Sequence, residues 1–472
     1  MQSKIKGKFH NYLELLEVFI NEYVGKIKED EGADILRIGP YCIEVPFKKY
    51  IFSRLALNQR SKELNNSISE KVLSQLDIKN FLVAFESDLT FTRLNWPSNH
   101  HKDLYSLMFD AYAPLLEPHR QKITYYALHE RFLTFMLPVL SRIPHEIVVL
   151  CESPVPDDLE HGDNIFIIEL DFQWIQQYQN KCLKKLFPDF LAMFNNLELF
   201  ITLLEPSTLL VVEGNHYQFE MLAILGKNKG VPVICLQQGW PGILTTQFKE
   251  MQYTYFLSWG DGFSDIFRSN NPNPSYISTG YPFKIEKALD RTGITFFLQA
   301  PILVSNRQAY SELLELVVFC AEQFPDRPIY VREHPEFPLK SNDIRLGDYR
   351  NVELVPPDSI ALSKVFSNSV LAISIFSSTL MEALIYGTIP FIYNPNLMES
   401  YCPNLSKEGL GIEVSSLKEA KIQISNLMGN PIFLKAFAER ISKNSSYYYA
   451  SHGEASLEQT TRAIMEINKG NT

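Results

Sequence analysis

The chain has 472 residues, so we expect two or three domains, because a single hydrophobic core rarely grows beyond about 250–300 residues. Hydrophobic residues make up 46% and charged residues 21%, which is typical of a globular protein and excludes a disordered chain. The formal net charge of −10 argues against a general nucleic-acid binder, so no nucleic-acid partner is expected.

The six cysteines are widely spaced, with no C-x-x-C pair and no histidine at ligand spacing. This favours a reduced, cytoplasmic protein, and we expect no metal site. No run approaches the roughly 20 apolar residues of a membrane-spanning helix. Lys4, Lys6 and Lys8 offer a contact to anionic lipid at the inner face of the cytoplasmic membrane, although lysines at a terminus are more often simply solvated.

The first part of the chain mixes helical and strand patterns. Apolar positions at helical spacing predict a helix over residues 9–31, and short β-like runs follow over 34–48. A strand is predicted at 81–86. Helical periodicity then returns over 104–116 and 124–141.

From residue 147 the strands become clearer and alternate with helices. Helices are predicted at 173–204 and through Phe219 and Leu225 to a stop at Gly230, where the glycine marks a helix end. The alternation lacks hairpin signals and therefore indicates a parallel α/β domain. The strands predicted here lie at 147–151, 165–169, from 208, 231–236, 255–259 and 276–279.

A charged stretch at residues 284–292 indicates a linker, after which the α/β pattern restarts. We therefore predict an N-terminal domain at 1–284, a C-terminal domain at 285–453 and a final helix at 454–472 that could cross back to the N-terminal domain. The strands predicted in the second half are 296–304, 328–332, 352–355, 371–375 and 389–393, and the helices are 307–323, 359–367, 378–386, 417–428, 431–442 and 454–468.

Polar residues follow a buried strand of the second half and run into a helix. Ligands of open parallel sheets collect outside the carboxyl ends of strands, where a helix N-terminus offers free N–H groups. The hydroxyls of Ser377, Ser378 and Thr379 would form a phosphate cradle there, and Glu382 one turn later suits ribose hydroxyls. A structural alternative makes Thr379 and Glu382 a capping box, which leaves the two serines unexplained.

His334 is expected to project from the tip of another strand of the second half. Pro335 biases the residue before it toward an extended conformation. With Arg332 behind it, this histidine can pair with a phosphate or a pyrimidine. The alternative is a histidine with a structural role alone.

Glu213, Gly214, Asn215 and His216 occupy the equivalent strand end in the first half. A carboxylate at such a tip suits a general base or a nucleophile at an anomeric carbon. An aspartate would have been natural at Asn215. The alternative is that Glu213 is an ordinary charge at a helix N-terminus.

Further strand ends of the first half add candidates. Gln238, Gly239 and Trp240 form a loop whose amide and indole groups suit a sugar or a nucleotide. Glu152 and Glu86 also end strands, so either is a candidate for a second carboxylate near the site.

At these residues the chain resembles the GT-B glycosyltransferases of bacterial surface-polysaccharide assembly. The His334–Pro335 pair and residues 377–379 are similar to the motifs with which bacterial sialyltransferases and β-Kdo transferases bind CMP, and residues 212–215 partly match their acidic-glycine motif. With the Gln-Gln-Gly-Trp and Gly-Tyr-Pro segments, the pattern looks closest to the retaining β-Kdo transferases. The resemblance covers roughly residues 205–400 and implies an α/β GT-B fold, with two Rossmann-like domains whose parallel sheets face each other across a cleft.

The resemblance implies a transferase that moves Kdo, or a related ulosonic acid, from its CMP ester to an oligosaccharide or glycolipid acceptor in O-antigen or capsule synthesis. It implies double displacement through an enzyme carboxylate, without a metal or other cofactor. If that carboxylate belongs at position 213 the chain is active, and if it belongs at 215 the chain is a crippled or trapping variant. The implied catalytic residues are Glu213, Asn215, His216 and Glu152, and the implied donor-binding residues are Gln238, Gly239, Trp240, Arg332, His334, Pro335, Ser377, Ser378, Thr379 and Glu382.

Two kinds of alternative stay open. A UDP-sugar 2-epimerase or a CDP-glycerol glycerophosphotransferase would share the two-domain layout and a related Gln-x-Gly loop. A catalytically inactive nucleotide- or glycan-binding homologue would explain Asn215. The acceptor, the linkage stereochemistry and the oligomeric state are not indicated by the sequence.

Overall fold

The structure is a computed structural model that describes residues 12–56, 98–170, 186–240, 244–285, 291–299, 307–334, 339, 346–356, 362–375, 377–395 and 403–470. The strand predicted at 81–86, with Glu86, lies outside these residues. So do Pro335 and the lysines at positions 4, 6 and 8.

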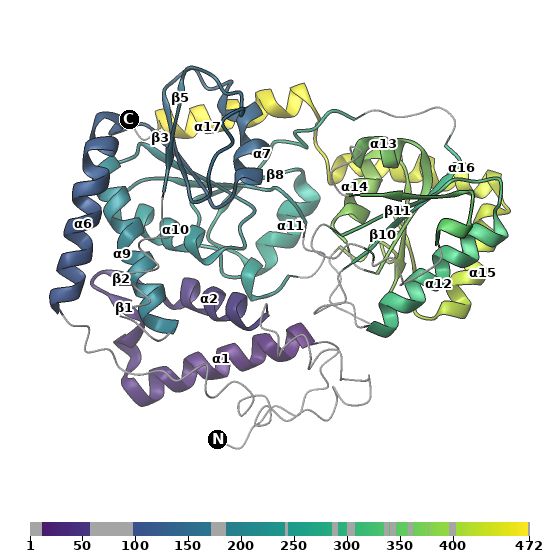
Figure 1. Cartoon of the computed structure of the whole chain (residues 1–472), viewed down its shortest axis with the longest axis horizontal. Helices are drawn as coiled ribbons and strands as arrows, with labels where there is room; N and C mark the ends of the chain where they lie inside the picture. Colours follow the sequence, from purple (N-terminus) through teal and green to yellow (C-terminus); the bar gives the residue numbers. More distant parts are fainter. Residues whose placement is uncertain are drawn as a thin grey trace.

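Residues 12–285, which we call the N-lobe, contain a seven-stranded sheet in which every pairing is parallel (Figure 1). The strand order is β5-β4-β3-β6-β7-β8-β9. The central strands are buried along their whole length, as expected where helices cover both faces of a sheet. The strands are β3 (Ile123–Ala127), β4 (Ile147–Cys151), β5 (Ile165–Glu169), β6 (Thr208–Val212), β7 (Val233–Leu236), β8 (Tyr255–Ser258) and β9 (Ser275–Ser278).

Residues 291–444, the C-lobe, contain a second parallel sheet of six strands in the order β12-β11-β10-β13-β14-β15. The fold is thus α/β with two Rossmann-like sheets, as predicted. The strands are β10 (Gly293–Phe297), β11 (Ile329–Arg332), β12 (Val352–Val355), β13 (Ser369–Ser374), β14 (Ile389–Tyr393) and β15 (Ile412–Val414).

The strand order reverses once in each sheet. In the N-lobe the chain builds β3, β4 and β5 outward and then returns to place β6 on the other side of β3. In the C-lobe it returns in the same way to place β13 beside β10. Ligands of such folds bind at the carboxyl ends of the strands where the order reverses. Glu213 directly follows β6, and residues 377–379 follow β13, so both predicted motifs lie at these two positions.

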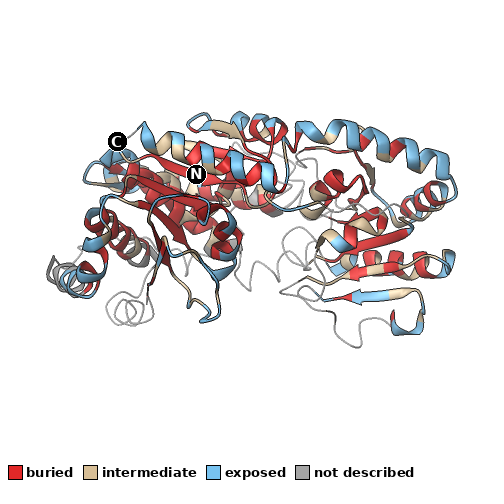
Figure 2. Ribbon diagram, turned by 90° about the horizontal axis from the view of Figure 1, so that it is seen from above, coloured by how far each residue is buried: buried red, intermediate tan, exposed pale blue. Residues whose placement is uncertain are grey.

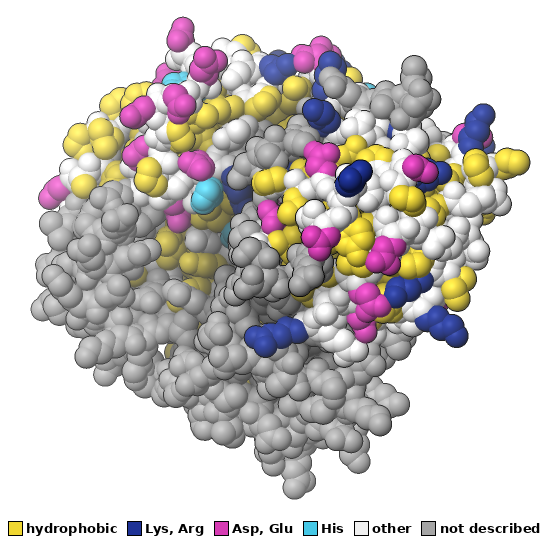
Figure 3. Space-filling model, turned by 45° about the vertical axis from the view of Figure 1, so that its right-hand side comes forward, with side chains coloured by type: hydrophobic (Ala, Val, Ile, Leu, Met, Phe, Trp, Pro, Cys, Tyr) yellow, Lys and Arg dark blue, Asp and Glu magenta, His cyan; other side chains and the backbone are white. Residues whose placement is uncertain are grey.

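Helices cover the faces of both sheets, and Figure 2 shows the buried residues concentrated in the strands and on the helix faces turned toward them. On the face in Figure 3, the described acidic and basic side chains are mixed. The helices are α1 (Tyr12–Glu31), α2 (Glu44–Ala56), α6 (Ser98–Leu116), α7 (Glu130–Leu140), α9 (Leu186–Leu204), α10 (Tyr217–Lys229), α11 (Asp261–Asn270), α12 (Arg307–Gln323), α13 (Leu362–Ser367), α14 (Thr379–Tyr386), α15 (Leu417–Met428), α16 (Pro431–Asn444) and α17 (Glu454–Lys469).

Several predicted elements were wrong. The short β-like runs expected over 34–48 are confirmed only as the two-residue strands β1 (Arg37–Ile38) and β2 (Tyr41–Cys42). A 3-10 helix (Ala33–Leu36) precedes them, and α2 begins at Glu44. The helix predicted at 124–141 is instead β3 followed by α7, because a fully buried strand and a buried helix give similar apolar runs. Helix α11 was not predicted at all. The strand predicted at 296–304 is β10, which begins three residues earlier and ends at Phe297; residues 300–304 lie outside the described residues.

The C-terminal segment returns from the C-lobe to the N-lobe. Side chains of α17, among them Leu457 and Ile464, share a hydrophobic core with β3 and β4. Arg142, which follows α7, holds Glu454 at the start of α17 with Nη2 2.7 Å from both carboxylate oxygens. Figure 1 shows α17, in yellow, beside the helices and strands of the N-lobe.

Glycines allow this returning segment to approach closely. The N–H of Tyr281 donates to the carbonyl of Ser451 at 2.8 Å, and that of Gly453 donates to Tyr281 at 2.9 Å. A Cβ at Gly280, whose φ is +90°, would lie 2.2 Å from Ser451 Oγ and 2.5 Å from its carbonyl oxygen. A side chain at position 280 would therefore push the two segments apart.

We expect Gly280→Ala to lower the free energy of unfolding by clearly more than Gly230→Ala. Gly230 also has a positive φ, of +72°, but has open space where its Cβ would be, so its substitution should cost only about 1 kcal/mol of backbone strain. Urea denaturation of both variants measures the difference. If both variants lost the same free energy of unfolding, the close approach at Gly280 would not contribute to stability.

Candidate functional site

Glu213 has an unusual backbone conformation at the carboxyl end of β6. Its φ is +71°, and Gly214 follows with +83°. The N–H of Glu213 donates to the carbonyl of Leu236 on β7 at 2.8 Å, which fixes the turn against the neighbouring strand. A glutamate in the left-handed region costs of order 1–3 kcal/mol, and such strain concentrates at functional sites.

His216 holds the Glu213 carboxylate. The Nε2 atom of the histidine lies 3.1 Å from Oε2 of Glu213, and the two side chains are 30% and 21% exposed. The imidazole itself packs edge-on against Phe132 and Phe219. The carboxylate is thus oriented but still reachable from solvent.

Asn215 differs from Glu213 in its surroundings. Its Oδ1 atom is shielded from solvent and accepts no hydrogen bond from any described residue. Because a buried carboxylate without a donor is disfavoured in its charged form, an aspartate in this position would resist ionisation.

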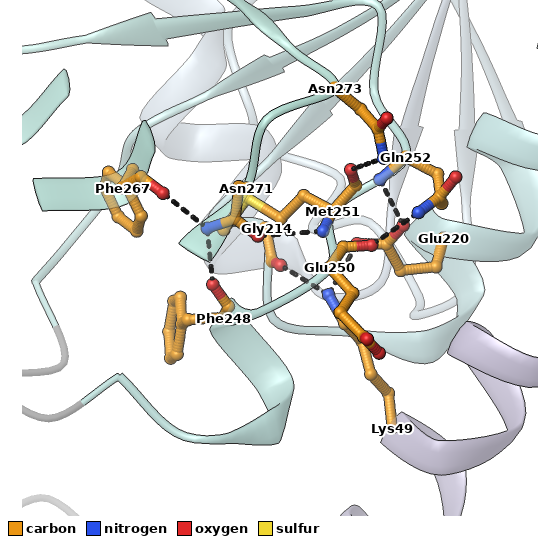
Figure 4. Close-up of polar contacts among 10 residues, drawn as sticks. All are labelled: Lys49, Gly214, Glu220, Phe248, Glu250, Met251, Gln252, Phe267, Asn271 and Asn273. Atoms are coloured by element: carbon orange, nitrogen blue, oxygen red, sulfur yellow. Dashed lines mark hydrogen bonds and ion pairs between the residues drawn. The ribbon is translucent and has the colours of Figure 1, made fainter. Parts of the chain in front are cut away.

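A buried ion pair lies beneath the Gly214 turn (Figure 4). Lys49 of α2 and Glu220 of α10 are both fully buried, with Nζ and Oε1 2.5 Å apart. Lys49 also lies 3.5 Å from the carbonyl of Gly214, and the second oxygen of Glu220 accepts the N–H of Gln252 at 2.9 Å. The sequence carries no signal for this pair, because nothing in a lone lysine of an N-terminal helix indicates its distant partner.

Asn271 braces the segment that carries Gln252, as Figure 4 also shows. Its amide nitrogen donates to the carbonyls of Phe248 and Phe267 at 2.8 and 2.9 Å, and its oxygen accepts the N–H of Met251 at 2.9 Å. Met251 in turn lies against Gly214, where a Cβ would come within 3.3 Å of its methyl group. The strained turn therefore packs against a segment that the Asn271 hydrogen bonds hold in place.

Glu152 follows β4, two strands away from β6 in the sheet. The hydroxyl of Tyr126, on the intervening β3, donates to its carboxyl group. Burial raises the pKa of Glu152 to about 7, and the tyrosine hydrogen bond opposes the rise only in part. A carboxyl group with this pKa can give or take a proton near neutral pH.

The loop after β7 divides into a packed part and an accessible part. Gln237 is buried and accepts the N–H of Trp259 at 2.9 Å, which ties the ends of β7 and β8 together. The Trp240 ring is only 3% exposed and packs against the aromatic rings of α11. Gln238 and Gly239 are half-buried, so they are the predicted residues of this loop that remain partly open.

The predicted phosphate cradle lies at the start of α14. The Ser377 hydroxyl accepts the N–H of Thr379 at 3.3 Å and lies 2.6 Å from its hydroxyl. The capping-box alternative was wrong, because Ser378 precedes the helix and makes no side-chain cap, while Thr379 is already its first residue. All three hydroxyl residues are half-buried at the helix N-terminus.

Glu382 joins the two lobes. The Tyr281 hydroxyl, just beyond β9, donates to its carboxylate at 2.7 Å, so the carboxyl ends of the two sheets meet at this point. Burial raises the pKa of Glu382 to about 7, although the tyrosine hydrogen bond and the positive charge of Arg332 oppose the rise. Arg332 ends β11, and His334 is half-buried two residues further on.

The part of the chain that the structure describes contains no cluster of three His, Cys, Asp or Glu side chains arranged to hold a metal ion. Among its helices, none has the length and apolar character needed to cross a membrane.

No family model matches the chain, and no curated protein is similar to it in sequence. Solved structures share its fold. A variant of the wall teichoic acid polymerase TagF aligns with 79% of this chain and 96% of its own, at 13% identity and a TM-score of 0.50. A candidate UDP-N-acetylglucosamine 2-epimerase from Listeria monocytogenes aligns with 75% of this chain and 98% of its own, at 11% identity and a TM-score of 0.51. The predicted GT-B fold is confirmed.

Removal of the Lys49 charge should strongly destabilise the N-lobe. We expect Lys49→Met to cost about 3–5 kcal/mol, because it leaves Glu220 as an unpaired buried charge. Adding Glu220→Gln should recover much of the loss, since the amide can still accept from Gln252. Denaturant titration measures both variants, with the exposed Lys26→Met as control. The buried ion pair would be contradicted if Lys49→Met lowered the free energy of unfolding only slightly and adding Glu220→Gln did not reduce that loss.

Glu152 and Glu382 should make stability depend on pH. Burial raises the pKa of both from an ordinary 4.5 to about 7, so their contribution to stability is complete below pH 4.5 and is lost as the pH rises through 7. Glu152→Gln and Glu382→Gln should therefore raise the melting temperature, relative to the unchanged protein, more at about pH 8 than at about pH 5. The exposed Glu458→Gln is the control. A pH-independent difference would refute the raised pKa values.

Proposed function

We propose that this protein is a glycosyltransferase that moves Kdo, or a related ulosonic acid, from its CMP ester to an oligosaccharide or glycolipid acceptor in O-antigen or capsule synthesis. The observation that carries the proposal is the Glu213 carboxylate. It stands where the strand order of the first sheet reverses, in a strained conformation, and is held by His216. Strain of this kind is retained where a reactive group must be aimed.

The donor nucleotide would lie at the carboxyl end of the second sheet. Ser377, Ser378 and Thr379, at the N-terminus of α14, would hold the phosphate with hydroxyl and N–H groups. In this proposal the partial positive charge of the helix end stabilises the leaving phosphate, and neither a metal nor another cofactor takes part. Glu382 would bind the ribose hydroxyls by exchanging its bond to Tyr281.

Residues from other strand ends would complete the donor site. Arg332, His334 and Pro335 would contact the phosphate and the cytosine, and Gln238 and Gly239 would contact the sugar. Trp240 would support this loop rather than contact the sugar, since its ring packs in the core. In this proposal residues 1–284 bind the acceptor and carry the catalytic carboxylate, and residues 285–453 bind the donor. Residues 454–472 anchor the end of the chain.

The chemistry would proceed by double displacement. An oxygen of Glu213 attacks the anomeric carbon, and the bond from that carbon to the phosphate oxygen breaks, so that CMP leaves with the bonding electron pair. An acceptor hydroxyl then attacks the same carbon and releases Glu213, while its proton passes to a base. Glu152, with a pKa of about 7, is the base that we propose. Two inversions retain the anomeric configuration.

A second candidate function follows from the structural similarities. One similar structure is named as a candidate UDP-N-acetylglucosamine 2-epimerase, and the other as a wall teichoic acid polymerase. The alternative functions are therefore a UDP-sugar 2-epimerase and a CDP-glycerol transferase like the teichoic acid polymerases. An inactive binding homologue is the third alternative. It would require that position 215, now an amide, is where the nucleophile belongs.

Calorimetry with CMP, UMP, UDP and GDP tests the donor. We expect CMP to bind most tightly, because a cytidine monophosphate is the proposed leaving group. Preference for UDP, together with turnover of UDP-N-acetylhexosamine, would establish the epimerase instead, and turnover of CDP-glycerol would establish the glycerophosphotransferase.

Glu213→Gln tests the chemistry. It should lower kcat with a CMP-ulosonic acid by about 10³-fold or more, because the amide cannot form the covalent intermediate. CMP affinity should stay within about twofold, since the carboxylate acts on the sugar. If Glu213→Gln has no effect while Asn215→Asp creates activity, the nucleophile belongs at position 215.

A further inference from the structure

A cavity of about 500 Å³ lies in the C-lobe at the end of the sheet opposite to the proposed donor site. Its walls include Ile389, the first residue of β14, and Thr292, just before β10. The C-terminal end of α14 and one side of α16 also line this cavity, which is open to solvent. Since parallel strands all start at the same edge, this cavity is separate from residues 377–379 at the carboxyl ends.

Basic side chains dominate the charged groups of this cavity. Arg291, Arg327 and Lys435 line it, and Glu439 is the acidic residue among the lining groups. None of the three cations forms an ion pair with a residue that the structure describes. The cavity therefore has a local charge of about +2 in a protein whose formal net charge is −10.

Lys435 is exposed, whereas Arg327 and Arg291 are half-buried, and Arg291 is held by hydrogen bonds. Its Nη1 donates to the carbonyl of Tyr386, the last residue of α14, at 2.8 Å, and to the Thr388 hydroxyl at 3.4 Å. Both acceptors are uncharged. Burial lowers the pKa of this guanidinium, and no described acidic group opposes the change. Because removing a charge even partly from water is unfavourable unless the charge is paired, an anion beside Arg291 would stabilise it.

Most of the remaining residues that line the cavity are apolar, and Thr292 and Ser442 are the polar exceptions. Tyr386, Ile389 and Leu434 line it, so a ligand that fills it needs a hydrophobic part as well as its charge. Two large apolar side chains protrude nearby at the start of α16, Ile432 at 83% and Phe433 at 45% exposure. Helix α16 thus presents an apolar tip directly beside a basic cavity.

We propose that this cavity binds the phosphate of an amphiphilic phosphate ester, with Arg291, Arg327 and Lys435 around the phosphate and the apolar part along α16. The cavity is lined by three basic side chains and one acidic side chain. This charge suits a ligand with a phosphate group better than a ligand with a single carboxylate. The phosphate can come from an anionic phospholipid headgroup, with Ile432 and Phe433 in the acyl region, or from a free phosphate ester. The proposal is independent of the transferase activity.

Binding of phenyl phosphate, measured by calorimetry, and cosedimentation with phosphatidylcholine vesicles with and without phosphatidylglycerol test the site on the full chain. The test variant is Arg327→Gln/Lys435→Gln, which spares Arg291 because that residue also holds the end of α14. The matched control is Lys418→Gln/Arg462→Gln, which removes two exposed charges elsewhere. Melting temperatures confirm that both variants fold.

We expect the test variant to weaken binding at least about tenfold and the control to leave it unchanged. Phenyl phosphate binding without vesicle binding assigns the site to a free ester. Vesicle binding that needs phosphatidylglycerol, and that Ile432→Ser/Phe433→Ser also reduces, assigns it to a lipid headgroup. Absence of binding to both probes, or equal binding by the test and control variants, overturns the proposal.

Discussion

The reversal of strand order between β3 and β6, and again between β10 and β13, is the constraint on which the candidate site depends. Connections between parallel strands are right-handed, so strands added on opposite sides of a starting strand send their crossover helices to opposite faces of the sheet. The loops at the reversal separate and leave the strand ends open. Glu213 and residues 377–379 stand at these two openings, and the Tyr281–Glu382 hydrogen bond brings the carboxyl ends of the sheets together.

Four carboxyl groups near these strand ends differ in burial and in hydrogen-bond partners. Glu220 is fully buried but paired with Lys49, so it serves as a support. Glu152 and Glu382 are each held by a tyrosine hydroxyl and have a pKa raised by burial. Glu213 alone among them bonds to a histidine and keeps a fifth of its side chain exposed. In the proposed mechanism the nucleophile needs an oriented carboxylate that a substrate can reach, which fits Glu213. The proposed general base needs a pKa near neutrality, which fits Glu152.

Much of the fold and the position of the motifs could be predicted from the sequence. Uninterrupted apolar runs such as 147–151 and 209–212 indicated parallel strands. The polar residues that follow these runs had to collect at one edge of each sheet. The prediction failed at β3, where strand and helix patterns merge, and it could not reveal that Trp240 packs against α11. It also missed Lys49, whose partner lies 171 positions away. Periodicity carries local information only, whereas these contacts depend on which elements become neighbours.

The sequence by itself determined the α/β class, the two-part organisation and the strand ends that carry the polar candidate residues, because alternating apolar runs and turn residues specify local structure directly. Only the tertiary structure decided how those side chains behave. The Glu213 turn held by Leu236 of β7, the bond from Tyr281 to Glu382 and the basic cavity around Arg291 each combine residues from separate segments. Burial, pairing and strain arise when such segments pack, since the low dielectric of the interior and the exclusion of water exist only in the folded chain.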